Sequence, residues 1–485
     1  MGAGVPAGRV VAVRARLSAD EVSVGSGLLV TGRLVLTAAH VVAEADGRLL
    51  GAVSVRLSGS DRWWDATLVW SDPAAAVDAA LVKICESGWV PPVLPAVRWG
   101  RLTGQAGDVA AEAQGFPRSL RDGDERVREH ATGHVNPGVD EGARRYDLIV
   151  GEFPAEPPPG EASPWSGMSG AGLFAGGLLI GVLIVRTDRF AERRLRATPV
   201  HVLAADPGFC RLVASTVRLA VESVELAGLF TPAIEEWEPS PALLLHPARA
   251  AVGFYGRTGE RQDLAGWCVD PAASKVWVVV GPGGQGKTRL ATQVCAERGE
   301  AGWVAGLVDA YASADLIGRL VDTATPVLAV VDYADTRLDQ LRVLLGVLRQ
   351  RTAVPVRLLL LARSAATDGG WWSQLRSEFS ALCATVVPQS LEPLQDDADG
   401  RDDADGRAGS FHRAAADLAR AWAEIDTTAD WPALAATLPT PTDLSDGRYG
   451  LALTLHMTAL TGLLQAGPHR VAGTGPGGRR CAPRP

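Results

Sequence analysis

The feature that most constrains the fold is a glycine-rich stretch that follows an apolar run and precedes a helical pattern. Residues 276–291, VWVVVGPGGQGKTRLA, read as a buried strand, a loop and the first turns of a helix. Within them, residues 281–288 satisfy the pattern G-x-x-x-x-G-K-[ST], in which backbone amides and a helix N-terminus bind phosphate. The stretch therefore predicts a parallel α/β sheet with a nucleotide site at one edge.

The residue types in this loop each predict a contact with the nucleotide. Gly281, Gly284 and Gly286 let the backbone wrap around phosphate. Lys287, one of three lysines in the chain, is predicted to reach the β- and γ-phosphates, and Thr288 to offer its hydroxyl to Mg²⁺. We expect ATP rather than GTP, because no lysine follows an asparagine as the N-K-x-D pattern of GTPases requires.

Two further apolar runs end in polar residues that suit the same site. VLAVVDYAD (327–335) contains Asp332 at the end of a buried strand, where it is predicted to hold Mg²⁺ through water. Asp335 either polarises the attacking water or caps a helix. RLLLLAR (357–363) ends at Arg363, which either senses the γ-phosphate or has a structural role.

Residues 10–200 have a different pattern, because short apolar runs alternate with Gly, Pro and Asp, which is typical of an all-β fold. LVLTAAHVV (34–42) places His40 beside one such run, as either a core side chain or a catalytic base. VDAALVKI (77–84) places Asp78 at the start of another. This acid either belongs to a turn or pairs with an imidazole, since an unpaired carboxylate is costly beside a buried strand.

A third candidate lies in WSGMSGAGLF (165–174), where Ser169 stands between glycines. It is either an ordinary turn serine or a nucleophile, which needs a base, an acid that orients the base, and donors for an oxyanion. Small neighbours allow a sharp turn that leaves the amides of Gly167 and Ser169 as such donors. The order His, Asp, Ser within one β-rich segment favours the catalytic interpretation.

These motifs give residues 10–205 a resemblance to a trypsin-like (chymotrypsin-fold) serine protease of the bacterial intracellular kind. It rests on LVLTAAHVV, GMSGAG, GSG (25–27) and AQGFP (113–117). The resemblance implies two six-stranded β-barrels with the site between them. It assigns the base, the orienting acid and the nucleophile to His40, Asp78 and Ser169.

Two positions depart from the secreted members of that family. Met168 stands where those proteases carry an aspartate that pairs with a newly cut N-terminus, so we expect no activation by propeptide cleavage. Ser163, six residues before the nucleophile, stands where the family sets the charge of its specificity pocket. Because serine is uncharged, we expect no strict preference for Lys or Arg.

Residues 250–466 resemble the STAND class of P-loop ATPases (signal-transduction ATPases with numerous domains). The resemblance rests on GFYGRTGERQDLAGW (253–267), GPGGQGKT, DYAD and LLLLAR, and on RYGLALTLHMTAL (448–460). Ala452 replaces the proline that is usual in this last segment, which weakens the adenine contact assigned there. The resemblance implies ATP and Mg²⁺ as ligands and self-association on ATP binding. Whether a C-terminal sensor region is truncated stays open.

Composition narrows the partners and the compartment. The net charge of −8 argues against nucleic acid as the main partner, since phosphate binding needs a basic face. The longest apolar run, residues 176–185, is about half of a membrane span. The N-terminus lacks a signal-peptide pattern and the six cysteines are scattered, so we expect a cytoplasmic protein without a membrane partner.

The sequence thus predicts a multidomain chain: an all-β double barrel of the trypsin-like kind, an α/β P-loop NTPase and a small α-helical subdomain. The expected segments are 1–205 protease, 206–250 helical and Pro-containing linker, 251–395 NTPase, 396–409 acidic loop, 410–466 helical subdomain and 467–485 disordered tail.

The expected function is a cytosolic serine endopeptidase that cuts a protein or peptide and is regulated by an ATP-binding STAND-type switch. The family resemblance implies a stress or anti-phage defence role. The alternative is a catalytically silent protease-fold scaffold that acts as an ATP-dependent signalling or binding module.

Overall fold

The computed structural model divides into two compact units, residues 1–227 with 322–324, and residues 228–321 with 325–485. The first division, after Ala227, lies inside the segment predicted to be a linker. The structure describes residues 5–16, 22–44, 46–74, 77–104, 107–118, 120–122, 125–136, 145–151, 163–185, 193–214, 219–231, 240–271, 275–350, 352–365, 370–382, 387–394 and 406–468.

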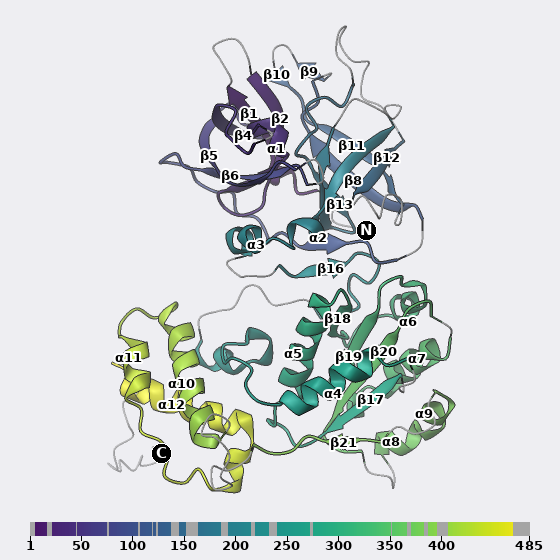
Figure 1. Ribbon diagram of the computed structural model, residues 1–485, viewed down its shortest axis with the longest axis vertical. Helices are drawn as coiled ribbons and strands as arrows, with labels where there is room; N and C mark the ends of the chain where they lie inside the picture. The colour runs from purple at the N-terminus through teal and green to yellow at the C-terminus, as the bar shows by residue number, and fades with distance from the viewer. Residues whose placement is uncertain are drawn as a thin grey trace, which may run out of the picture. The chain divides into compact units, whose positions relative to one another are not determined.

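The first unit begins with a closed six-stranded barrel of order β1-β2-β3-β6-β5-β4 (Figure 1, purple). Alternate residues of its strands enter two different cores, as the period of two along a strand requires. In β3, Val35 packs in one core while Leu34 and Leu36 pack in the other. The strands are β1 Val10–Arg16, β2 Val22–Leu29, β3 Leu34–Thr37, β4 Ala52–Leu57, β5 Trp64–Asp72 and β6 Ala79–Ile84.

A second six-stranded ring follows, because β13 pairs with β8 on one side and with β14 on the other. The two six-stranded barrels that the family resemblance implies are therefore present. The strands of this ring are β8 Val109–Gly115, β11 Glu129–Val135, β12 Tyr146–Val150, β13 Gly172–Ala175, β14 Leu178–Ile184 and β15 Arg194–Pro199. The short strands β9 Arg121–Asp122 and β10 Glu125–Arg126 pair separately.

Residues 206–250, predicted as a helical and Pro-containing linker with helical spacing over 210–230, are helical only in part. Helix α3 (Pro207–Ala214) follows α2 (Val200–Leu203), but β16 (Val221–Ser223) is a strand that pairs in parallel with β7 (Trp99–Arg101). The prediction of a helix across this stretch was wrong at β16. Backbone pairing with an available sheet edge outweighs a weak helical periodicity there.

The second unit contains a five-stranded parallel sheet of order β18-β19-β20-β17-β21. Helices α4 and α5 pack on one face, where they share a core with alternate residues of the strands, and Figure 1 shows α6 and α7 on the other face. This is the mixed α/β region that the sequence predicts. Its elements are α4 Thr258–Val269, β17 Val276–Val280, α5 Lys287–Glu300, β18 Val304–Leu307, α6 Ala314–Gly318, β19 Val327–Val331, α7 Leu338–Leu348, β20 Val356–Ala362, α8 Gly370–Gln374, α9 Arg376–Leu382 and β21 Gln389–Ser390.

Three helices form the C-terminal part of this unit: α10 Arg407–Ala423, α11 Trp431–Ala436 and α12 Ala452–Ala466. Their apolar faces enclose one core, to which Leu244 and Val252 also contribute. Helix α10 begins at Arg407, inside the predicted acidic loop, whose residues 396–405 lie outside the described residues, as do residues 469–485 of the predicted tail. Among the described helices, none is long and apolar enough to cross a membrane.

Candidate active site and glycine loop

His40 and Asp78 are brought together at the edge of the first barrel. The Nδ1 atom of His40 lies 2.8 Å from Oδ2 of Asp78, and the backbone amide of His40 donates to Oδ1 at 3.0 Å. The Asp78 side chain is 2% exposed and that of His40 is 39% exposed. A carboxylate that accepts from Nδ1–H leaves Nε2 of the imidazole as the proton acceptor, on the side that solvent can reach.

The backbone around Asp78 is held in an uncommon conformation. Its φ of 49° lies in the left-handed region, which Asp tolerates better than most residues. The Asp78 carbonyl accepts from the amide of Ala39 at 3.1 Å, and the Asp78 amide donates to the carbonyl of Ala74 at 2.9 Å. From the second barrel, the hydroxyl of Thr198 donates to the carbonyl of Val77. Both barrels therefore position the acid.

Ser169 lies in the loop between β12 and β13 and is 3% exposed. Its Oγ accepts a hydrogen bond from the amide of Val185 at 3.2 Å. Within the described residues, no hydrogen bond joins this hydroxyl to His40. The structure therefore joins the acid to the base, and it holds the serine hydroxyl on a backbone amide of the second barrel.

The serine loop nevertheless packs directly on β2, the strand that also approaches Val41, the neighbour of His40. The Ser169 carbonyl accepts from the amide of Ser26 at 2.8 Å. A Cβ on Gly25 would lie 2.8 Å from the Ser169 carbonyl and 2.6 Å from Cγ2 of Val41, the neighbour of His40. A Cβ on Gly170, which has a φ of 92°, would lie 2.0 Å from the Ser26 carbonyl. These glycines are required because the two segments approach so closely.

The amides of Gly167 and Ser169, the predicted oxyanion donors, lie in a tight turn. Gly167 has a φ of 102°, which favours glycine. The amide of Met168, between them, donates to the carbonyl of Trp165 at 2.9 Å. Within the part of the chain that the structure describes, the amides of Gly167 and Ser169 donate to no other protein group. They are therefore available to a ligand.

The two departures from the secreted proteases lie inside the fold. Met168 is fully buried in the core of the second barrel, with Trp165 and Leu173 among its neighbours in that core. Ser163 is also buried, and its Oγ accepts from the amide of Trp165 at 3.2 Å. Met168, the residue before Ser169, thus contributes apolar packing to the core of the second barrel.

In the second unit, the glycine loop connects β17 to α5. Gly281, Gly284 and Gly286 have φ values of 154°, 81° and 99°, so their left-handed conformations explain why the loop needs glycine. Helix α5 begins immediately afterwards at Lys287. The loop thus ends at the N-terminus of a 14-residue helix, where the helix dipole and unpaired amides attract anions.

The side chains of this loop reach the end of the neighbouring strand β19. Nζ of Lys287 donates to the carbonyls of Gly281 and Pro282 at 2.6 and 2.9 Å. The hydroxyl of Thr288 donates to Oδ2 of Asp332 at 2.8 Å. The hydroxyl of Thr288 and the carboxylate of Asp332 are therefore adjacent.

Asp335 and Arg363 lie close enough to influence Lys287. Burial lowers the pKa of Lys287 and so does the charge of Arg363, whereas Asp332 and Asp335 oppose that shift. Asp335 lies within a short 3-10 helix (Ala334–Thr336) and so caps no helix, and its buried Oδ1 has no partner among the described residues. Arg363 follows β20 and is exposed. The charged groups predicted from the sequence thus share one electrostatic environment.

The last helix also contacts the glycine loop. The amide of Leu453, in the first turn of α12, donates to the carbonyl of Gly284 at 2.9 Å. A Cβ on Gly284 would lie 3.1 Å from Cβ of Leu453. The sequence indicated a helix here but gave no sign of this contact, because it joins two segments far apart in the chain.

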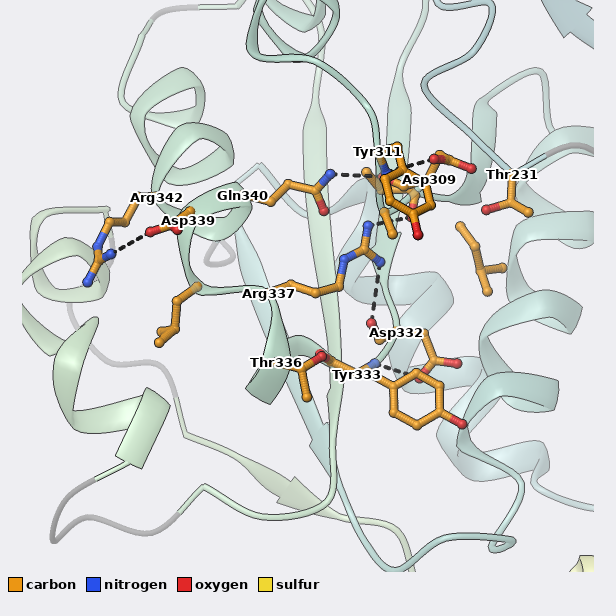
Figure 2. Close-up of a pocket in the computed structure, with 14 residues that line it drawn as sticks. Thr231, Asp309, Tyr311, Asp332, Tyr333, Thr336, Arg337, Asp339, Gln340 and Arg342 are labelled. Atoms are coloured by element: carbon orange, nitrogen blue, oxygen red, sulfur yellow. Dashed lines mark hydrogen bonds and ion pairs between the residues drawn. The ribbon is translucent and has the colours of Figure 1, made fainter.

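A pocket of about 900 Å³ lies on another side of Asp332 (Figure 2). Arg337 crosses it and donates to the carbonyls of Val308 and Asp332 at 2.8 and 3.4 Å. Gln340 donates to the carbonyl of Asp309 at 2.8 Å. Asp332 therefore borders both the glycine loop and this pocket.

Among the described residues, no group of three or more His, Cys, Asp or Glu side chains is arranged to hold a metal.

Ser26 was not predicted as a residue of the site. It is fully buried, and its hydroxyl donates to the carbonyl of Gly167 at 2.8 Å and accepts from the amide of Phe116 at 2.8 Å. A polar residue between two glycines was the available signal. GSG was used only as part of a resemblance, although glycines on both sides of a buried serine indicate close approach of another backbone.

Comparison with known proteins found no match among curated proteins. Two solved structures of the Rv3671c protease from M. tuberculosis are similar to part of the chain. The active form is 20% identical with a TM-score of 0.30, and the match covers 44% of this chain and 84% of that chain. The inactive form, a serine-to-alanine mutant, is 19% identical with a TM-score of 0.28, and covers 41% and 85%.

A family model extends over the region that contains the candidate triad. It describes the trypsin-like peptidase domain and matches residues 25–182, from the glycine before Ser26 into β14. His40, Asp78 and Ser169 all lie within the match. The prediction of a protease-like domain is supported at this level, because residues 25–182 match the model of the trypsin-like peptidase domain.

Proposed function

We propose that the chain is a serine endopeptidase in which His40, Asp78 and Ser169 act as base, orienting acid and nucleophile. The observation that carries this proposal is the 2.8 Å contact between Nδ1 of His40 and a buried carboxylate oxygen of Asp78, inside the trypsin-like peptidase domain. A buried aspartate that fixes one imidazole tautomer is what a general base at Nε2 needs.

In this mechanism, the Ser169 hydroxyl exchanges its bond with the Val185 amide for one with Nε2 of His40, through a change of side-chain rotamer. His40 removes the proton as Oγ attacks the carbonyl of a peptide, and Asp78 stabilises the imidazolium that forms. The amides of Gly167 and Ser169 donate to the oxyanion. His40 then returns the proton to the leaving amine, and water hydrolyses the acyl-enzyme.

We further propose that the glycine loop binds ATP with Mg²⁺. Lys287 and the loop amides would bind the phosphates, and Thr288 with Asp332 would hold the metal, since this hydroxyl and carboxylate already lie 2.8 Å apart. The left-handed glycines and the start of α5 support this assignment. Bound ATP would supply a triphosphate whose hydrolysis can drive a change of state. Asp335 would orient water, and Arg363 would respond to the γ-phosphate.

Together these sites suggest a protease that an ATP-dependent switch of the STAND kind controls, with self-association on ATP binding. The proposed substrate is a protein or peptide, the proposed compartment is the cytoplasm, and the proposed setting is stress or anti-phage defence. We propose neither a nucleic acid nor a membrane as a partner. The net charge of −8 argues against nucleic acid, because phosphate binding needs a basic face.

Labelling with a fluorophosphonate probe tests both parts. The wild-type chain, Ser169→Ala, Lys287→Ala and Lys275→Ala are compared with and without ATP–Mg²⁺. Lys275 is the matched control, because its Nζ donates to the carbonyl of Leu348 at 2.6 Å, away from the loop. We expect no labelling of Ser169→Ala. Labelling of wild type and Lys275→Ala should depend on nucleotide, whereas labelling of Lys287→Ala should be the same with and without nucleotide.

One observation favours a second candidate, a catalytically silent scaffold that acts as an ATP-dependent binding module. Ser169 Oγ bonds to Val185 and, within the described residues, not to His40. Absence of labelling in the wild type under every condition, while ATP still binds, would support this scaffold and reject the protease.

A further inference from the structure

The nucleophile loop raises the question of what keeps its oxyanion donors in place. Residues 166–169, SGMS, carry no charged side chain, so no ion pair of their own orders this loop. The position of an amide N–H is fixed by the planar peptide unit that contains it, in which the N–H points opposite to the carbonyl. The carbonyl partners of residues 166–169 therefore determine where the donor amides point.

Each of these four carbonyls has a defined partner. The Ser166 carbonyl accepts from the amide of Arg118 at 2.6 Å, and this sets the direction of the Gly167 N–H. The Met168 carbonyl accepts from the amide of Ala171 at 3.0 Å, and this sets the direction of the Ser169 N–H. Two hydrogen bonds between backbone groups thus orient the two donor amides.

The other two carbonyls both bond to Ser26. Its Oγ donates to the Gly167 carbonyl at 2.8 Å, and its amide donates to the Ser169 carbonyl at 2.8 Å. The first of these contacts fixes the peptide unit that lies between the two donor units. One residue of β2 thus holds the loop from the first barrel on both sides of Met168.

The hydroxyl of Ser26 is itself held in one orientation. It accepts from the amide of Phe116 at 2.8 Å, so its proton is directed to Gly167, and Ser26 is fully buried. A Cβ on Gly115 would lie 2.5 Å from this Oγ and 2.8 Å from Sδ of Met168. Backbone and core atoms therefore enclose the hydroxyl, and no water can replace it without a shift of its neighbours.

We propose that Ser26 is a positioning residue that preforms the oxyanion hole through its hydroxyl. The proposal rests on the protease function proposed above. Ser26 touches no reacting atom and acts through the peptide unit between Gly167 and Met168. Loss of the hydroxyl should weaken stabilisation of the transition state and leave both the general base and the ground-state binding of a peptide unchanged.

The test compares Ser26→Ala with Ser54→Ala in the full chain, using a peptide substrate. Ser54 is a buried serine of the same barrel whose Oγ accepts from Nε of Arg14 at 2.8 Å, away from the loop. For Ser26→Ala we expect kcat to fall by about 10- to 100-fold, somewhat less than when an oxyanion donor is removed outright. We expect KM and the pH midpoint of kcat/KM to stay unchanged, because His40 and Asp78 are untouched. Ser54→Ala should keep wild-type kcat.

Unchanged kcat in a folded Ser26→Ala variant would overturn the proposal while the protease function stands, and so would a shift of the pH midpoint. If the alanine variant does not fold, Ser26→Cys replaces it, because a thiol keeps a weak donor at this position. A lower kcat at constant KM then supports positioning, and an unchanged kcat overturns it. If the wild-type chain does not hydrolyse the peptide, both the proposed protease function and this inference are rejected.

Discussion

The carboxylate of Asp78 binds His40 twice, through Nδ1 of the ring at 2.8 Å and through the backbone amide at 3.0 Å. The same group thus fixes both the position of the residue and the tautomer of its imidazole. In the proposed mechanism the acid would therefore affect both the chemistry and the local backbone structure, and the two roles can be separated by substitution.

Replacement of Asp78 by Asn should lower kcat by about 10³–10⁴-fold, because an amide nitrogen facing Nδ1 favours the wrong tautomer. The chain should still fold, since Asn tolerates the φ of 49° at this position. Hydrolysis of a peptide substrate and circular dichroism measure the two effects. Asp65→Asn, at an exposed acid of β5, is the control and should keep full activity. Equal activity of both variants would reject Asp78 as the orienting acid.

Replacement of Thr288 by Ala should reduce the contribution of Mg²⁺ to ATP affinity. The variant loses the hydroxyl that lies 2.8 Å from Asp332, whereas Lys287 and the loop amides would keep their proposed contacts with phosphate. Titration with a fluorescent ATP analogue, with Mg²⁺ and with EDTA, should show a Mg²⁺ effect in wild type that shrinks by about tenfold in the variant. An undiminished Mg²⁺ effect would exclude Thr288 as a metal ligand.

Replacement of Met168 by Asp should destabilise the protease domain by about 3–5 kcal/mol, because a charge would enter an apolar core without a partner. An increase in stability would contradict the apolar environment that the structure gives this position. Thermal unfolding of the chain measures the change. Met457→Asp, where the methionine is 51% exposed, should shift the transition far less.

The second unit should lose stability in mild acid because of His456. Burial, and then the charge of Arg289, lower its pKa to about 4, and Asp417 only partly opposes this shift. Between the unfolded value of 6.5 and about 4, the unfolded chain binds a proton that the folded chain rejects, so the free energy of unfolding falls as the pH falls. The total loss should be roughly 3 kcal/mol, since the shift from 6.5 to about 4 spans about 2.5 pKa units and one unit corresponds to about 1.4 kcal/mol.

Thermal unfolding at pH 7 and at pH 4.5 checks this. His456→Gln should lose less stability over this interval than wild type. His412→Gln, at an exposed histidine of the neighbouring helix α10, should behave like wild type. An identical acid response in His456→Gln and wild type would assign the response to other groups.

The features that the sequence could predict are those carried by local patterns. A strand, a glycine loop and a helix follow one another in the chain, so the left-handed glycines before Lys287 could be anticipated from their order alone. Short apolar runs indicated the all-β fold of residues 10–200, and the family resemblance implied its two barrels. The meeting of His40 and Asp78 was predicted only with the help of a family resemblance, because backbone geometry brings together residues 38 positions apart.

The features that the sequence could not predict depend on distant pairing. The partners of the Ser26 hydroxyl lie 90 and 141 positions away, and no local pattern encodes them. Strand β16 was mistaken for helix because its partner β7 is equally remote. The bond between Ser169 and Val185 depends on a single side-chain rotamer, which sequence patterns do not specify.

The bond from the amide of Leu453 to the carbonyl of Gly284 makes the first turn of α12 a part of the glycine loop's own hydrogen-bond network. A phosphate ligand that rotated the Gly284 peptide would break this bond and leave the start of the helix without its anchor. A ligand that kept the peptide in place would strengthen the attachment. The orientation of one peptide plane would thereby affect how firmly the first turn of α12 is held against the glycine loop.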